Sequence, residues 1–167
     1  PPSFLFPMGP AYVASALEQA GYSFDIYAFL YDNRSWFRDG THETAADCDD
    51  SDAFHWIPAV NAIGELRSII HQRQYDYILT GGLVGFFRWF YDVLPSLKGY
   101  SSGSRLILGG GMTKDVAAET LFRNLPIDYA LAGEAETNLG GLLDCLETGA
   151  RGFEALASIP GVICKDG

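Results

Sequence analysis

The feature that most constrains the fold of this chain is a repeated pattern of helix, strand and glycine. Apolar residues at helical spacing precede a short apolar run, and each run ends in glycine. The three repeats place helices near residues 59–74, 84–94 and 115–124, strands at 75–80, 105–108 and 128–132, and glycines at 81–82, 109–111 and 133. Strands separated by single helices predict right-handed crossovers and an α/β fold with a mostly parallel sheet covered on both faces.

The remaining segments fit a single domain spanning residues 1–167. The spacing of apolar residues predicts helices over 9–21 and 136–147, while alternation over 22–29 predicts a strand near an edge of the sheet. A last apolar run at 161–164 predicts an added edge strand. Residues 31–58 are acidic and irregular, so we expect an insertion that forms a lid or lacks regular structure.

Charge and cysteine content exclude several classes of protein. The 167 residues contain 11 Lys and Arg against 21 Asp and Glu, a net charge of −10, which argues against nucleic acid and anionic membranes as partners. The chain has no membrane-length apolar run and no leader pattern, so we expect a cytoplasmic protein. Its three scattered cysteines predict neither disulfides nor a metal site. Because it starts at proline and stops without a terminal cap, we expect a piece of a longer chain.

The glycine clusters fall where the predicted strands end, and ligands of parallel sheets bind at that edge. Glycine is also the usual residue of tight turns, so each cluster alone has a purely structural explanation. A dinucleotide fingerprint is not met, because Lys114 stands where its third glycine belongs, and a nucleotide P-loop is absent.

The other candidate sites are explained more simply. His42 and His55 lie in the acidic insertion without the ligand frame of a cation loop, so we interpret that segment as solvated. His71, near a helix end, is interpreted as structural. Glu134 and Glu136 suit a helix start, although a hydrogen bond from Glu134 to a cofactor stays open.

Five short motifs occur in order along nearly the whole chain outside residues 31–58. They are FPMGPAYVA at 6–14, YDYI at 75–78, LILGGG at 106–111, IDYALAGEAET at 127–137 and IPGV at 159–162. Together they resemble the N-terminal cobalamin-binding domain of cobalamin-dependent radical SAM proteins.

That resemblance implies a flavodoxin-like, doubly wound, three-layer sheet that carries the corrin ring on its carboxyl edge and the nucleotide tail between sheet and helices. The loops after successive strands would line the cofactor. The residues carried over are Met8, Thr80, Gly81, Gly82, Leu83, Gly109, Gly110, Gly111, Met112, Thr113, Gly133, Glu134 and Thr137.

Two departures from the family pattern bear on these expectations. The D-x-H-x-x-G motif that supplies an axial histidine in other B12 domains is missing, so cobalamin would bind without a protein histidine. The family's first, central strand is also missing. Residues 3–6 would supply a short substitute, the neighbouring strands would close up, or another copy would lend a strand.

The resemblance implies a cobalamin-binding module that presents the cofactor for methyl transfer or related radical chemistry. The radical SAM catalytic domain of the parent chain, with S-adenosylmethionine and a [4Fe-4S] cluster, would lie outside this segment, which alone would not be catalytic. Aromatic residues at 86–91 suit core packing or an interface with that domain or a second subunit. The alternatives are a cofactor-free flavodoxin-like docking or substrate-recognition domain and, as a third option, a flavin-binding variant.

Overall fold

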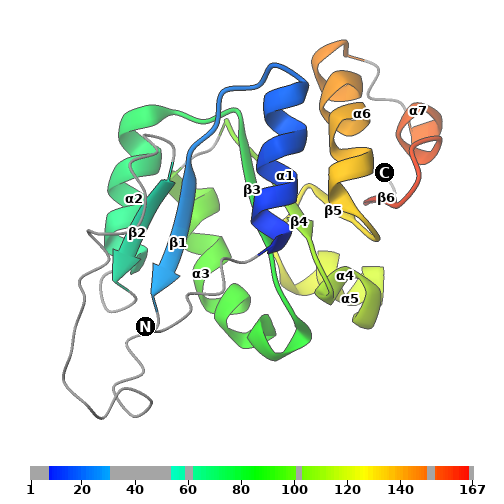
Figure 1. The fold of residues 1–167 in the computed structure, drawn as a ribbon. Helices are drawn as coiled ribbons and strands as arrows, with labels where there is room; N and C mark the ends of the chain where they lie inside the picture. Colours follow the sequence, from blue (N-terminus) through cyan, green and yellow to red (C-terminus); the bar gives the residue numbers. More distant parts are fainter. Residues whose placement is uncertain (1–7, 31–53, 59–61, 101–102, 150–152, 166–167) are drawn as a thin grey trace.

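A computed structural model of the chain describes residues 8–30, 54–58, 62–100, 103–149 and 153–165. Helices and strands alternate along most of this length (Figure 1). In order they are α1 (Met8–Gln19), β1 (Ile26–Leu30), β2 (Phe54–Pro58), α2 (Ala62–Arg73), β3 (Tyr77–Gly81), the 3₁₀ turn η3 (Val84–Phe86), α3 (Phe87–Tyr100), β4 (Arg105–Gly109), α4 (Met112–Asp115), α5 (Ala118–Asn124), β5 (Tyr129–Leu131), α6 (Ala135–Glu147), α7 (Phe153–Ala157) and β6 (Val162–Cys164).

The described strands form two hydrogen-bonded groups. A four-stranded sheet has the order β3-β4-β5-β6, in which the first three strands are parallel and β6 is antiparallel to β5. Strands β1 and β2 pair with each other in parallel as a separate two-stranded sheet. The predicted α/β fold with a mostly parallel sheet, and the added edge strand at 161–164, are therefore confirmed.

Alternate residues of the central strands point to opposite faces of the four-stranded sheet, and helices cover both faces. Leu106 and Leu108 of β4 pack in one apolar cluster with residues of α2, α3 and α5. Ile107, between them, packs in a second cluster with residues of α1, α6 and α7. Figure 1 shows α1 beside α6 in front of the sheet and α3 behind it. None of the helices in the described ranges is long and apolar enough to cross a membrane.

Polar side chains connect the two sheets at the amino end of β1. The Tyr75 hydroxyl, just before β3, donates to Asp25 Oδ2 at 2.5 Å and lies 2.8 Å from the Tyr27 hydroxyl. Arg73 pairs with the same carboxylate at 2.6 Å. Burial and the hydrogen bond to Asp25 raise the pKa of Tyr75 well above its ordinary value.

Several predicted boundaries are wrong. Residues 54–58, assigned to the irregular insertion, form β2, and the strand predicted at 22–29 begins only at Ile26. The helix predicted over 115–124 begins only at Ala118, as α5, because Val116 is extended (φ −115°, ψ 129°) and ends the separate short helix α4 before it. Helix α7 was not expected. Residues 3–6, expected to replace the missing first strand, lie outside the described ranges. The second expectation, that the neighbouring strands pair directly, is not met in the part of the chain that the structure describes, because β1 does not pair with β3 there.

Candidate functional site

The loops that follow β3, β4 and β5 form one edge of the four-stranded sheet, which we call the glycine rim (residues 81–84, 109–113 and 133–137). Parallel register brings the first two loops together, because Gly81 lies opposite Gly109. A Cβ atom on Gly81 would lie 3.0 Å from the Gly109 carbonyl oxygen. Gly110 has φ +82°, and its Cβ would lie 3.0 Å from the backbone nitrogen of Gly82. These glycines are therefore required by the close approach of two loops.

Hydrogen bonds tie the three loops of the glycine rim to one another. The Met112 backbone nitrogen donates to the Gly82 carbonyl at 2.8 Å, which joins the first loop to the second. The buried Thr113 hydroxyl lies 2.8 Å from the carbonyl oxygens of both Gly110 and Leu131, which joins the second loop to the end of β5. Because these hydrogen bonds join protein groups to one another, the loops of the rim are held together without a ligand.

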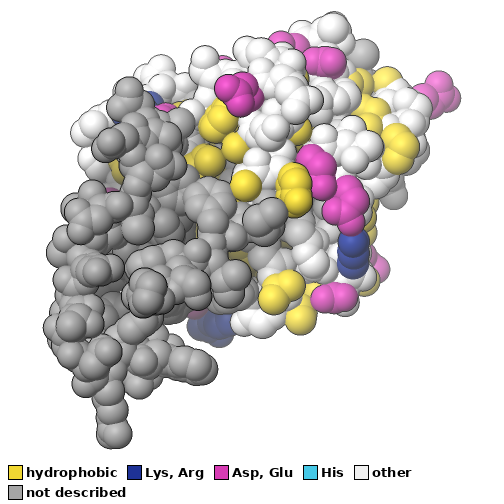
Figure 2. Space-filling model, in the orientation of Figure 1, with side chains coloured by type: hydrophobic (Ala, Val, Ile, Leu, Met, Phe, Trp, Pro, Cys, Tyr) yellow, Lys and Arg dark blue, Asp and Glu magenta, His cyan; other side chains and the backbone are white. Residues whose placement is uncertain are grey.

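The outward surface of the rim is partly apolar. A Cβ atom on Gly109 or Gly133 would meet nothing within 4 Å. Leu83 and Val84, directly after the first glycine pair, are 64% and 49% exposed. Thr80 is half-buried at the end of β3. Figure 2 shows hydrophobic and acidic side chains side by side at the lower end of the molecule, where β3 and β4 end in Figure 1. An apolar ligand face could rest on this surface.

The predicted site residues divide into inward-facing and outward-facing groups. Met112 is fully buried in the core, and the Thr113 side chain is used by the rim itself, so neither side chain faces solvent. Glu134 is exposed and lies 3.8 Å from Lys114, so it connects the second and third loops across the rim. It makes no capping hydrogen bond to α6 through its side chain.

Of the two remaining predicted residues, Thr137 belongs to the third loop of the rim, and Met8 belongs to α1. Thr137 is exposed in the first turn of α6, and its backbone nitrogen donates to the Glu134 carbonyl at 3.1 Å. Met8 begins α1. Sequence reasoning missed Val84 as a rim residue, and it missed the contact of Lys114, the residue after the second loop, with Glu134. An apolar pair in a loop after two glycines is the signal that would have found Val84.

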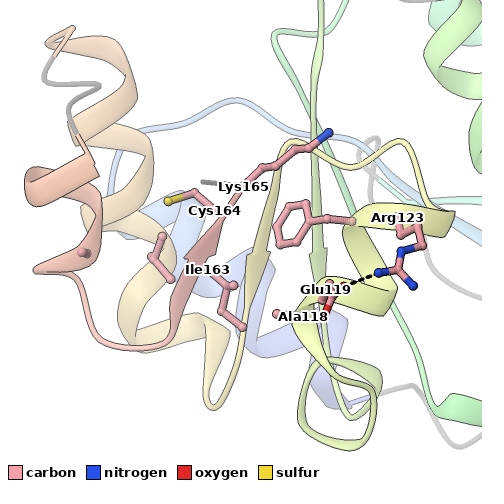
Figure 3. A pocket seen from close by; sticks show the side chains of 9 residues that line it. Ala118, Glu119, Arg123, Ile163, Cys164 and Lys165 are labelled. Atoms are coloured by element: carbon pink, nitrogen blue, oxygen red, sulfur yellow. Dashed lines mark hydrogen bonds and ion pairs between the residues drawn. The ribbon is translucent and has the colours of Figure 1, made fainter. Parts of the chain in front are cut away.

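A separate groove lies between α5 and β6 (Figure 3). It has a volume of about 610 Å³, and Phe122 and Ile163 contribute to its mainly apolar lining. Arg123 and Glu119, which also line it, form an ion pair. No predicted site residue lines this groove.

The remaining candidates from the sequence add no second site. No group of His, Cys, Asp and Glu suited to a metal occurs within the described ranges. His42 and the side chain of His55 lie outside the described part, whereas His71 is exposed in the last turn of α2. The aromatic segment at the start of α3 is mainly core, since Phe90 is 3% exposed, although Tyr91 is 47% exposed.

No family model matches this chain, and a search of curated proteins finds no significant match. The resemblance to cobalamin-binding domains therefore depends on the motifs in the sequence, and the structural observation that bears on function is the geometry of the glycine rim.

Proposed function

We propose that this chain is a flavodoxin-like cobalamin-binding module, with the corrin ring lying on the glycine rim. The observation that carries the proposal is the outward surface of the rim. Two glycines with open space above them, Gly109 and Gly133, lie on the same edge as the exposed Leu83 and Val84. A large planar ring needs such a surface, because side chains at the glycine positions would hold it away from the backbone.

The residues present fit the ring in two respects. Leu83 and Val84 offer apolar contact to its face, and the exposed Thr137 hydroxyl and half-buried Thr80 hydroxyl are suited to its amide side chains. The second respect is rigidity, since internal hydrogen bonds fix the loops. When bound, cobalamin would supply methyl transfer or related radical chemistry together with a radical SAM domain of the parent chain.

The alternative is a cofactor-free docking or substrate-recognition domain. One observation favours it specifically: Gly81 and Gly110 are already explained by the contact between the first two loops. Under that alternative the glycines need no ligand, and the exposed Leu83 and Val84 would contact a protein.

The test is retention of hydroxocobalamin by the purified chain after gel filtration. We expect about one equivalent in the protein peak, with visible colour. Gly109→Val should lower the retained cofactor at least about tenfold, because it adds a side chain above the rim where Cβ meets no atom of the protein. Gly103→Val, before the opposite end of β4 and equally free of close contacts, is the matched control and should retain the cofactor.

Two results would count against the proposal. A colourless peak from a folded wild-type sample favours the docking domain, and a yellow preparation favours a flavin. Gly110→Val is unsuitable as a test, because the positive φ of Gly110 and its contact with Gly82 would disturb the loops whether or not a ligand binds.

A further inference from the structure

The groove between α5 and β6 runs along one edge of the four-stranded sheet. Its lining includes four successive residues of the chain, 162–165. Successive side chains of a strand point to opposite faces, so a groove that touches all four residues must follow the edge of β6. In the part of the chain that the structure describes, β6 is the last strand of this sheet.

The two walls of the groove belong to opposite faces of the sheet. Phe122 of α5 packs against the apolar cluster on one face. Helix α7 contributes Ala157 to the groove, and its Leu156 belongs to the cluster on the other face. The groove therefore opens at the edge between α5 and α7. Phe122 and Ile163 are only half-buried although both pack against the core, so apolar surface is exposed there.

Backbone groups of β6 also point toward this edge. The Ala132 nitrogen donates to the Gly161 carbonyl at 2.8 Å, which is a hydrogen bond of the antiparallel pairing between β5 and β6. Because hydrogen-bonded pairs alternate along such strands, the backbone groups of Val162 and Cys164 point away from β5. The Val162 nitrogen donates to the Ile159 carbonyl at 3.2 Å. The Val162 carbonyl and both backbone groups of Cys164 are therefore placed to pair with an added strand.

The sequence of β6 suits pairing with a second copy of itself. In an antiparallel pair centred on Ile163, each Cys164 nitrogen would donate to the Val162 carbonyl of the second copy. The Ile163 side chains of the two copies would then lie side by side and cover part of the apolar surface. Strand β6 contains no proline and no charged residue, which are common means of blocking an exposed strand edge.

The charges that line the groove are complementary across this pairing. Figure 3 shows Lys165 toward one end of the groove and Glu119 toward the other end. Lys165 comes two residues after Ile163, so the alternation of side chains places it on the face of the sheet that α5 covers. An antiparallel second copy brings its Glu119 toward Lys165, and symmetry repeats this contact.

We propose that two copies of this chain associate through the edges of β6, so that a two-fold axis relates their joined sheets. Backbone pairing, apolar contact and opposite charges all fit this one arrangement. None of the residues of the glycine rim lines the groove, so the proposal does not depend on a bound ring. Because the edge is short, we expect a weak dimer with a dissociation constant of about 10–100 μM.

Sedimentation equilibrium in reducing buffer, from about 5 μM to about 1 mM protein, tests the proposal. We expect the average mass to rise from that of one copy toward that of two. Cys164→Pro removes an N–H that points away from β5, so it should weaken association at least about tenfold while circular dichroism stays unchanged. Cys164→Ala keeps that N–H and should associate like the wild type. A wild-type chain that stays monomeric at about 1 mM would overturn the proposal.

Charge reversal tests the contact between Lys165 and Glu119. Glu119→Lys and Lys165→Glu each place like charges together, so each variant alone should associate about tenfold more weakly. An equal mixture of the two variants restores opposite charges and should form a mixed dimer. Glu18→Lys, the same change at an exposed position of α1, is the matched control and should associate like the wild type. A dimer that neither reversal weakens would use another surface and would overturn the proposal.

Discussion

Single residues at the end of the sheet show how a backbone contact can require glycine. Gly161, before β6, has φ +75°, and a Cβ atom there would lie 2.1 Å from the Ala132 carbonyl oxygen. The Gly161 carbonyl in turn accepts a hydrogen bond from the Ala132 nitrogen at 2.8 Å. We predict that Gly161→Ala lowers the free energy of unfolding by more than about 2 kcal/mol, because it combines an unfavourable φ with a clash against backbone.

The matched control for this prediction is Gly149→Ala. Gly149 has nearly the same backbone angle, φ +76°, but its Cβ would meet nothing within 4 Å. Gly149→Ala should lower the free energy of unfolding by only about 1–2 kcal/mol, because only the backbone angle is unfavourable. Urea denaturation followed by circular dichroism measures both variants, and equal losses of stability would show that the contact with Ala132 relaxes freely.

At the scale of elements, α1 and α6 are joined by a polar contact as well as by the apolar layer. The Tyr22 hydroxyl, after α1, donates to Asp144 Oδ1 of α6 at 3.3 Å. Burial, followed by the negative charges of Glu147 and Asp144, raises the pKa of Tyr22 from 10 to about 12. The folded chain therefore holds this proton more tightly than the unfolded chain does.

The consequence is a loss of stability at alkaline pH. The raised pKa of Tyr22 contributes fully to the free energy of unfolding below about pH 10. This contribution falls as the pH rises from 10 to about 12, because the unfolded chain releases the Tyr22 proton more easily in that range than the folded chain does. We predict that Tyr22→Phe makes the free energy of unfolding less dependent on pH between about 10 and 12, as measured by urea denaturation. Tyr12→Phe, on the exposed side of α1, is the control. An unchanged pH dependence in Tyr22→Phe would contradict the prediction.

The elements also show which parts of the fold the sequence could predict. Apolar stripes located α1, α2, α3 and α6, because a helix buried on one face shows a helical period. Short apolar runs located β3 to β6, because a strand covered on both faces is apolar at successive positions. Strand β2 was missed because residues 54–58 lie among acidic residues and end in proline. The glycine clusters located the rim. That Gly81 packs against Gly109 depends on strand register, which sequence spacing alone does not specify.

At the scale of the whole molecule, the two sheets differ in how they are stabilised. Strands β4 and β5 lie between helices on both faces, and all three residues of β5 are buried. Strands β1 and β2 form a two-stranded sheet, and two-stranded sheets are marginally stable by themselves. The contacts of Tyr75 with Asp25 and Tyr27 help to hold β1 beside the larger sheet.

Native-state hydrogen exchange should resolve this difference. We predict that the backbone amides of β1 exchange at least about tenfold faster than those of β4, through an opening that leaves the four-stranded sheet intact. Tyr75→Phe removes the hydroxyl that bridges Asp25 and Tyr27, so it should speed exchange in β1 and leave β4 nearly unchanged. The control is Tyr12→Phe, which should alter neither strand. Equal protection of β1 and β4, with Tyr75→Phe accelerating both together, would mean that the two sheets open as one cooperative unit. In that case contacts across the apolar clusters, rather than backbone pairing between strands, would couple β1 to the larger sheet.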